Sequence, residues 1–294
     1  MAQICHYTTV EAFQEMLKNI SLKDGEPCLT FWASSIHAMN DPSEFVYGYK
    51  LLRDSILPAI EKELRIQSDS LKLSQLWKYR VKTGNSDEWD KQLVDSIYEN
   101  HNSPFIISFS RKKDFLPMWT TYSNKGRGIC LCFDNNKYAI KYGEVELLYG
   151  IHTKDASYDE VDKIISNAIK GLYEGEYQRY KHISDKRQRE QEMILSLARC
   201  AIVAAPYYKH EAYKYENESR WIQFKDDNTE VKYRCSKQGR LIPYIEIPIK
   251  LRSLEEVIVG PCADSDSVIR ALKYQLRQYG IENIHASTVP YREY

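Results

Sequence analysis

The chain has 294 residues, which at about 150 residues per domain allows one elaborated domain or one domain with an insertion. Its 41 basic residues balance 41 acidic residues, and this zero net charge speaks against a dedicated binder of nucleic acid or anionic membrane, although a local basic patch stays open. Hydrophobic residues at 43% and charged residues at 28% describe an ordinary soluble globular protein with a sizeable core.

The N-terminal part predicts a strand, a helix and a second strand. Residues 3–8 indicate a short strand, and Thr8-Thr9-Val10-Glu11 has the capping-box pattern that begins a helix. The apolar side chains of this helix recur at helical spacing, at Val10, Phe13, Leu17 and Ile20. Residues 28–33 predict the second strand, and a polar turn follows it at Asn40-Asp41-Pro42.

The centre of the chain predicts further strands. Residues 104–110 have a clear strand pattern, and residues 115–123 indicate a short helix or turn. A strand at 129–133 follows Gly126 and Gly128, and more strands are expected within residues 138–151.

Two stretches are helical and polar, at about 44–100 and at 157–200. The middle of the second stretch is almost wholly polar, which fits either a solvated helical arm or a break between two helices. A nucleic-acid-binding patch is the alternative that we favour less.

Strands return in the C-terminal part, at residues 213–224, 231–235, 241–249 and 255–259. An amphipathic helix follows Asp264-Ser265 and stops at Gly280. Its inward side chains are Val268, Ile269, Leu272, Leu276 and Tyr279. A last short strand is expected at 281–286. We therefore predict a single α+β domain over residues 1–294, with helical insertions at about 44–100 and 157–200.

Cysteine usage and hydropathy indicate the compartment. Seven cysteines, an odd number without a C-x-x-C motif, argue for reduced thiols. The first nine residues lack the basic and apolar regions of a signal peptide, and the most apolar stretch, from Ala201, is far too short to span a membrane. We expect a cytoplasmic protein that does not cross a membrane.

The segment Tyr213–Phe224 raises a question about charge. As a strand it would project Glu216, Glu218 and Arg220 from one face, so that two like charges repel and Arg220 relieves them only in part. That face is either exposed to solvent or lines a site.

Simple catalytic and metal-binding motifs do not explain the chain. Cys5 and His6 would point to opposite faces of a strand, so they cannot form a thiol–imidazole dyad directly. Cys130 and Cys132 alternate within a strand, where we favour small buried apolar residues over a metal site. His37, Asp41 and Glu44 could bind a metal, but a turn is the simpler interpretation, so no metal is predicted.

Four segments in their order resemble a known family. They are H-Y-T at His6, N-D-P-x-E at Asn40, M-W-x-x-Y at Met118 with Gly128 and Phe133 after it, and Y-E-x-E-x-R at Tyr215. Together they are similar to a bacterial family of unknown function that looks like a branch of the ADP-ribosyltransferase superfamily, with some members associated with antiviral defence. The resemblance spans most of the chain and leaves out the two helical stretches.

This resemblance implies an ADP-ribosyltransferase-like core of short strands in two packed sheets. It also implies an NAD-dependent ADP-ribosyltransferase or NAD glycohydrolase, such as a toxin or an antiviral-defence effector. Cleavage of the bond between nicotinamide and ribose develops an oxocarbenium-like cation, which a nearby carboxylate stabilises. By the motif, Glu218 is the catalytic carboxylate, and Glu216 presents the acceptor.

The resemblance also implies the residues that bind NAD. His6 would contact the adenosine ribose, and Tyr122 or Tyr7 would stack on nicotinamide. Arg220 would hold the glutamate pair or a pyrophosphate through a bidentate contact. Asn40 and Asp41 would contact the nucleotide or only form a turn. Thr8 and Trp119, from the same motifs, complete the set.

Two alternatives to an enzyme stay open. One is a non-catalytic module on the same fold that binds a nucleotide or a partner. The other is a structural effector subunit that assembles through residues 157–200. For the enzyme, the macromolecular acceptor is a protein or a nucleic acid, and the helices at 157–200 would meet a protein partner or a second copy of the chain.

Overall fold

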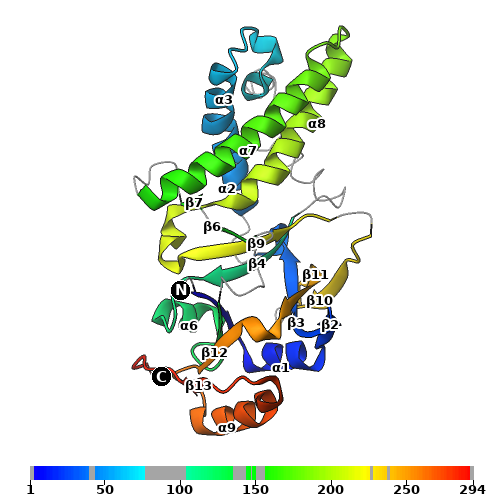
Figure 1. Ribbon diagram of the computed structural model, residues 1–294. Helices are drawn as coiled ribbons and strands as arrows, with labels where there is room; N and C mark the ends of the chain where they lie inside the picture. The colour runs from blue at the N-terminus through cyan, green and yellow to red at the C-terminus, as the bar shows by residue number, and fades with distance from the viewer. Residues whose placement is uncertain are drawn as a thin grey trace.

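The computed structural model describes residues 3–39, 44–76, 104–134, 144–146, 148–149, 156–225, 228–236 and 239–291. The fold is α+β, with a large mixed sheet and several helices, as predicted (Figure 1). Helices α2, α3, α7 and α8 gather at one end of the molecule, whereas α1 and α9 lie at the opposite end (Figure 1).

The elements of the N-terminal half follow one another along the chain. They are β1 (Gln3–Thr8), α1 (Val10–Lys18), β2 (Ser21–Lys23), β3 (Glu26–Ser35), the 3-10 turn η1 (Ile36–Ala38), α2 (Glu44–Leu51), the π-helical turn η2 (Leu52–Ile56), α3 (Leu57–Glu63), η3 (Asp69–Leu71), β4 (Phe105–Ser110), α6 (Leu116–Tyr122) and β5 (Ile129–Asp134).

The C-terminal half holds the long helices and the remaining strands. They are β6 (Glu144–Glu146), β7 (Leu148–Tyr149), α7 (Ala156–Tyr180), α8 (Lys186–Ala204), η4 (Ala205–Tyr207), β8 (Tyr208–Lys209), η5 (Glu211–Glu216), β9 (Glu218–Gln223), β10 (Lys232–Cys235), β11 (Leu241–Lys250), η6 (Leu251–Ser253), β12 (Leu254–Val259), α9 (Ser265–Leu276), η7 (Arg277–Tyr279) and β13 (Ile284–Ala286).

The large sheet branches at β4. Its main path runs β10-β11-β3-β4-β1-β5-β12-β13, and β9 pairs with the whole length of β4. The other edge of β4 is divided, because β3 pairs at Phe105 and Ile106 whereas β1 pairs at Ser110. The strands β3 and β1 therefore diverge along β4. The described strands form this single branched sheet and the short pair β7–β8, in place of the two packed sheets expected.

Both faces of the central strands are covered. Every residue of β5 is buried, because α1 and α9 pack on one face and α6 on the other. The α9 side chains Leu272 and Leu276 are buried, as predicted, in the apolar core between the sheet and helices α1 and α9. A separate apolar core joins α2, α3, α7 and α8.

Several local predictions are confirmed and others need correction. The polar stretch in 157–200 is a break between two helices, where Asp185 accepts a hydrogen bond from the Gln188 amide and begins α8. Helix α1 begins one residue later than the capping box suggested. Thr9 accepts from the Ala12 amide, because Thr8 still pairs with Ile129 in the sheet.

The stretch 44–100 is helical over α2 and α3, while residues 77–103 lie outside the described part. No helix in the ranges given above is both long enough and apolar enough to cross a membrane.

Candidate functional site

His6 fills the gap where β1 and β3 diverge from β4. Its Nδ1 lies 2.9 Å from the Ser108 carbonyl oxygen. Ser108 lies on β4 between the residues that pair with β3 and the residue that pairs with β1. The ring makes edge contacts with Phe31 and Phe109. Burial lowers the pKa of His6 more than the Ser108 contact raises it. The ring is therefore neutral at pH 7, with its proton on Nδ1 and its Nε2 left as an acceptor.

A pocket of about 100 Å³ opens beside this gap. It brings together five of the predicted site residues, namely His6, Tyr7, Tyr122, Glu216 and Glu218. The other side chains and backbone groups that line it belong to Cys5, Met39, Glu44, Ser108, Phe109, Ser110, Met118, Lys209 and Tyr213. Residues from β1, β4, α6, β8, η5 and β9 thus converge, although they are more than 200 positions apart at the extremes.

The two glutamates reach the pocket from a turn and a strand. Glu216 ends the 3-10 turn η5, Asn217 adopts the left-handed conformation with φ 44°, and Glu218 begins β9. The predicted strand from Tyr213 is therefore wrong up to Asn217, since asparagine tolerates the left-handed conformation that ends the turn. The Ser110 hydroxyl donates to the Glu216 carbonyl oxygen over 2.6 Å and fixes the turn against β4.

Lys209 resolves the repulsion between the two carboxylates. Its Nζ lies 2.6 Å from Glu216 Oε2 and 2.5 Å from Glu218 Oε2, and all three side chains are buried. Its ammonium also lies 4.8 Å from the centroid of the Tyr213 ring. Lys209 is not among the residues predicted from the sequence. Lys209 directly follows the mostly apolar segment 201–208, which indicates that it is buried. Since a buried lysine requires a charged partner, this position could have suggested an acidic neighbour.

Arg220 lies beneath the pocket and does not line it. Its Nε donates to Glu218 Oε1 over 2.7 Å, so the predicted shared face of these two residues is confirmed. Its Nη2 binds Glu44 at the start of α2, and its Nη1 donates to the Pro206 carbonyl. Of the two predicted roles, the structure supports holding the glutamate, since the guanidinium is fully buried. The Glu44 carboxylate is thereby used for an ion pair instead of a metal.

The site is a buried cluster of three carboxylates and two cations, Glu44, Glu216, Glu218, Lys209 and Arg220. Burial opposes the charge of Lys209, but Glu218 and Glu216 outweigh it and raise the pKa of Lys209. Burial also raises the pKa of Glu218, against the attraction of Lys209. The cluster thus holds three carboxylates and two cations, and burial favours the neutral form of Glu218 in particular.

Tyr122 adds a neutral donor to the cluster. Its hydroxyl donates to Glu216 Oε1 over 2.6 Å from helix α6. Burial and the Glu216 charge raise the pKa of Tyr122, so the phenol stays protonated at pH 7. Glu216 therefore accepts hydrogen bonds at both oxygens, from Tyr122 and Lys209.

Tyr7 and Trp119 position β1 and α6. The Tyr7 hydroxyl donates to the Lys112 carbonyl over 2.8 Å and accepts from the Phe115 amide over 3.0 Å. The Tyr7 ring stands edge-on to Trp119, with centroids 5.0 Å apart. Trp119 is fully buried, and its Nε1 donates to Asp114. The Tyr7 and Tyr122 hydroxyls are thus both held by hydrogen bonds, and both residues line the pocket.

Two of the predicted residues that the structure describes, Thr8 and Trp119, lie away from the pocket lining. Thr8 pairs with Ile129 within the sheet. Asn40 and Asp41 lie outside the described residues, so their predicted nucleotide contacts stay predictions.

Comparison with known proteins gives one match. The model of a family described as "Protein of unknown function (DUF2971)" matches residues 118–221, and a domain of this family is detected there. The match includes Tyr122, Lys209, Glu216, Glu218 and Arg220 and leaves out β1 with His6. No curated protein and no solved structure matches the chain. Over residues 118–221, the chain is similar to a protein family of unknown function.

Proposed function

We propose that this pocket is the active site of an NAD-dependent ADP-ribosyltransferase or NAD glycohydrolase. The observation that carries the proposal is the convergence of His6, Tyr122, Glu216 and Glu218 on one pocket at the branch of the sheet. The resemblance of the chain in its motifs gives these residues their expected roles. A setting in toxicity or antiviral defence follows from the resemblance alone.

The chemistry of the pocket suits a sugar that becomes cationic. Departure of nicotinamide leaves positive charge on the ribose, and Glu218, near the wall of the pocket, would stabilise it. The His6 Nε2 would accept a hydrogen bond from a ribose hydroxyl, because its Nδ1 is held at Ser108. The ring of Tyr122 or Tyr7 would stack on nicotinamide.

The size of the pocket limits what it encloses. Its volume of about 100 Å³ is well below the roughly 300–1,000 Å³ of pockets that enclose drug-sized ligands. Under this proposal it would enclose only part of NAD, around the ribose groups that His6 and Glu218 contact, and the rest of the dinucleotide would extend beyond it.

A second function has an observation of its own in its favour. Both carboxylate oxygens of Glu218 already accept hydrogen bonds, from Lys209 and from Arg220. A ribose hydroxyl would have to share or displace the Lys209 contact. If it cannot, the same pocket would serve a non-catalytic module that binds a nucleotide or a partner.

Turnover of NAD tests the proposal. We expect the purified chain, alone or with cell extract, to release nicotinamide from NAD, as measured by mass spectrometry. Glu218→Gln should abolish release. Glu176→Gln is the matched control, because Glu176 is also a buried carboxylate paired with an arginine, Arg199, but belongs to the α7–α8 helices. It should leave release unchanged.

The outcomes separate the two functions. Release that persists in Glu218→Gln would show that Glu218 is not the catalytic carboxylate. Binding of NAD in calorimetry without release would favour the binding module, and absence of both would exclude NAD as the ligand. The macromolecular acceptor stays a prediction, which modification of proteins or nucleic acids in the extract would test. A protein partner or second copy at α7 and α8 also stays a prediction, and the mass of the particle in solution would test it.

A further inference from the structure

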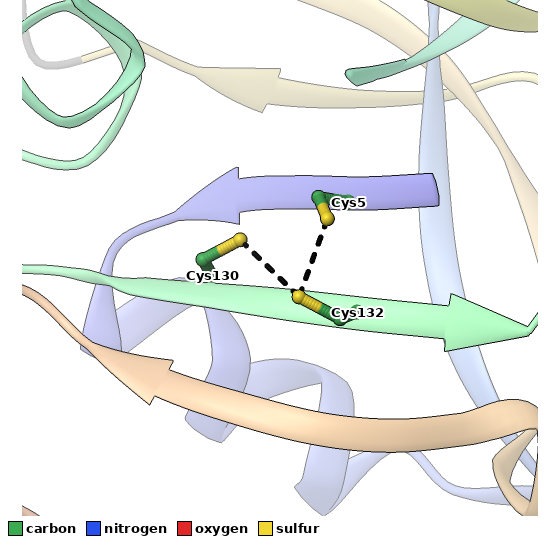
Figure 2. A group of neighbouring side chains, drawn as sticks. All are labelled: Cys5, Cys130 and Cys132. Carbon is green, nitrogen blue, oxygen red and sulfur yellow. Dashed lines mark hydrogen bonds between the residues drawn. The ribbon is translucent and has the colours of Figure 1, made fainter. Parts of the chain in front are cut away.

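Three thiols meet on the sheet face that α6 covers. Cys5 on β1 lies directly opposite Cys132 on β5, and Cys130 projects from the same face two residues earlier (Figure 2). The Cys5 and Cys132 sulfurs are 3.2 Å apart, and those of Cys130 and Cys132 are 3.7 Å apart. All three sulfurs lie within 4.8 Å of one another and none is in a disulfide.

This spacing fits a shared ion. Thiolates bind soft metals at about 2.3 Å, so three sulfurs around one ion stand roughly 3.7 to 4.0 Å apart. The separations of 3.2 and 3.7 Å lie at or below that range, and no pair of sulfurs is more than 4.8 Å apart. Small rotations about the Cys side chains would equalise them without moving the strands. From the sequence, Cys130 and Cys132 were interpreted as small buried apolar residues. The structure places Cys5 from β1 beside them, and the three thiols together could bind one metal ion.

The number of ligands narrows the type of ion. Over the described ranges, no histidine, carboxylate or further thiol joins the three sulfurs in one group. Structural zinc sites take four protein ligands, whereas monovalent copper is stable with three thiolates. The set therefore favours a thiophilic monovalent ion over zinc.

All three cysteines are buried, and Glu256 on β12, the register partner of Cys132, is paired with Lys113 and His285. Binding of an ion would release the protons of the thiols that become thiolates.

We propose that Cys5, Cys130 and Cys132 form a three-thiolate site for one monovalent copper ion. Access is through the pocket at the branch of the sheet, because Cys5 contributes to its wall. The site shares Cys5 with the wall of that pocket, but the proposal does not depend on the proposed NAD chemistry.

Copper binding by the full-length chain tests the proposal. Monovalent copper, kept reduced by a thiol-free reductant without oxygen, is titrated against a coloured copper chelator. We expect one ion per chain. Serine at Cys5, Cys130 or Cys132 should each weaken binding by more than about 100-fold, beyond the 10–100-fold loss typical of residues that only orient ligands. Cys200→Ser is the matched control, since Cys200 is a buried thiol in α8, and it should bind like the parent.

A second measurement covers variants that fail to fold. X-ray absorption of the copper-loaded parent chain should show three sulfur neighbours around each copper. Failure of the parent to retain copper against the chelator, two or fewer sulfur neighbours, or equal loss in Cys200→Ser would each overturn the proposal. The three thiols would then be small core residues beneath Trp119.

Discussion

Replacement of Lys209 by methionine tests whether the buried charge cluster is correctly described. Methionine keeps an unbranched apolar side chain of similar length, so the change removes the ammonium with little loss of packing. Glu216 and Glu218 would then lose the cation that lies 2.6 and 2.5 Å from their oxygens. Glu218 would keep Arg220 and Glu216 would keep Tyr122.

The expected loss of stability follows from the two contacts. At about 4 Å between charges and an effective dielectric constant of about 20, each contributes roughly 4 kcal/mol of Coulomb attraction, most of which offsets desolvation. Loss of one partner from a buried ion pair costs about 3 to 5 kcal/mol, because an uncompensated charge is left behind. We expect Lys209→Met to lower the free energy of unfolding by that amount near neutral pH.

The loss should also depend on pH. The folded-state pKa of Glu218 already lies above its ordinary value, so its contribution is most favourable at low pH and declines as pH rises through the folded pKa. Without Lys209, which lowers the pKa of Glu218, this pKa rises further, and Glu218 takes up a proton more readily. Lys209→Met should therefore approach the parent at about pH 5 and differ most at about pH 8.

Urea unfolding of both chains at the two pH values measures this effect. Lys18→Met is the control, because Lys18 forms an exposed pair with Glu15 at 2.7 Å, and such pairs contribute about 0–1 kcal/mol. A loss below about 1 kcal/mol for Lys209→Met at about pH 8, or an equal loss at both pH values, would refute the description of the cluster.

Three further changes test the surrounding structure. Asp114→Asn should lower the free energy of unfolding by about 2 to 4 kcal/mol in urea, since four hydrogen bonds to the carboxylate outweigh burial and lower its pKa. The parent should lose that contribution as pH falls through the lowered pKa, and a variant with unchanged acid sensitivity would contradict this. Gly128→Ala should cost about 3 kcal/mol or more in thermal unfolding, because its Cβ would lie 2.1 Å from a carbonyl oxygen of β1, whereas Gly175→Ala meets open space within α7 and should stabilise by about 0.5–1 kcal/mol. A backbone carbonyl and Glu256 raise the pKa of His285 above 6.5, so an NMR titration of Glu256→Gln should show it fall, and no change would refute the pairing.

Local sequence patterns predicted most helices and strands correctly but did not predict where some of them begin and end. Periodicity predicted β4, β5, β11 and α9, since each has a regular apolar pattern. The strand predicted from Tyr213 failed because alternation of side chains does not reveal a left-handed residue at Asn217. The start of α1 moved by one residue because pairing of Thr8 in the sheet competes with its use as a cap.

Glu216, Glu218 and Arg220 could be predicted from the sequence, whereas Lys209 could not. The resemblance named His6, Tyr122, Glu216 and Glu218 as site residues, and all four line one pocket. It could not show that Lys209 from β8 lies between the glutamates, because that contact depends on how distant elements pack. The thiol group had the same limit. Cys5 and Cys132 become neighbours only through the register of β1 against β5, which is information about pairing and not about either strand.

The alternation of β1 links the two proposals physically. Cys5 and Tyr7 face α6, His6 faces the gap at β4, and all three contribute to the pocket. The Tyr7 hydroxyl also holds the chain just before α6, the helix that carries Tyr122. An ion that tightens the thiols would therefore act on both walls of the pocket through a rigid strand. Nicotinamide release that responds to copper in the parent but not in Cys130→Ser would show this coupling, and a response that is equal in both would assign the effect to copper elsewhere.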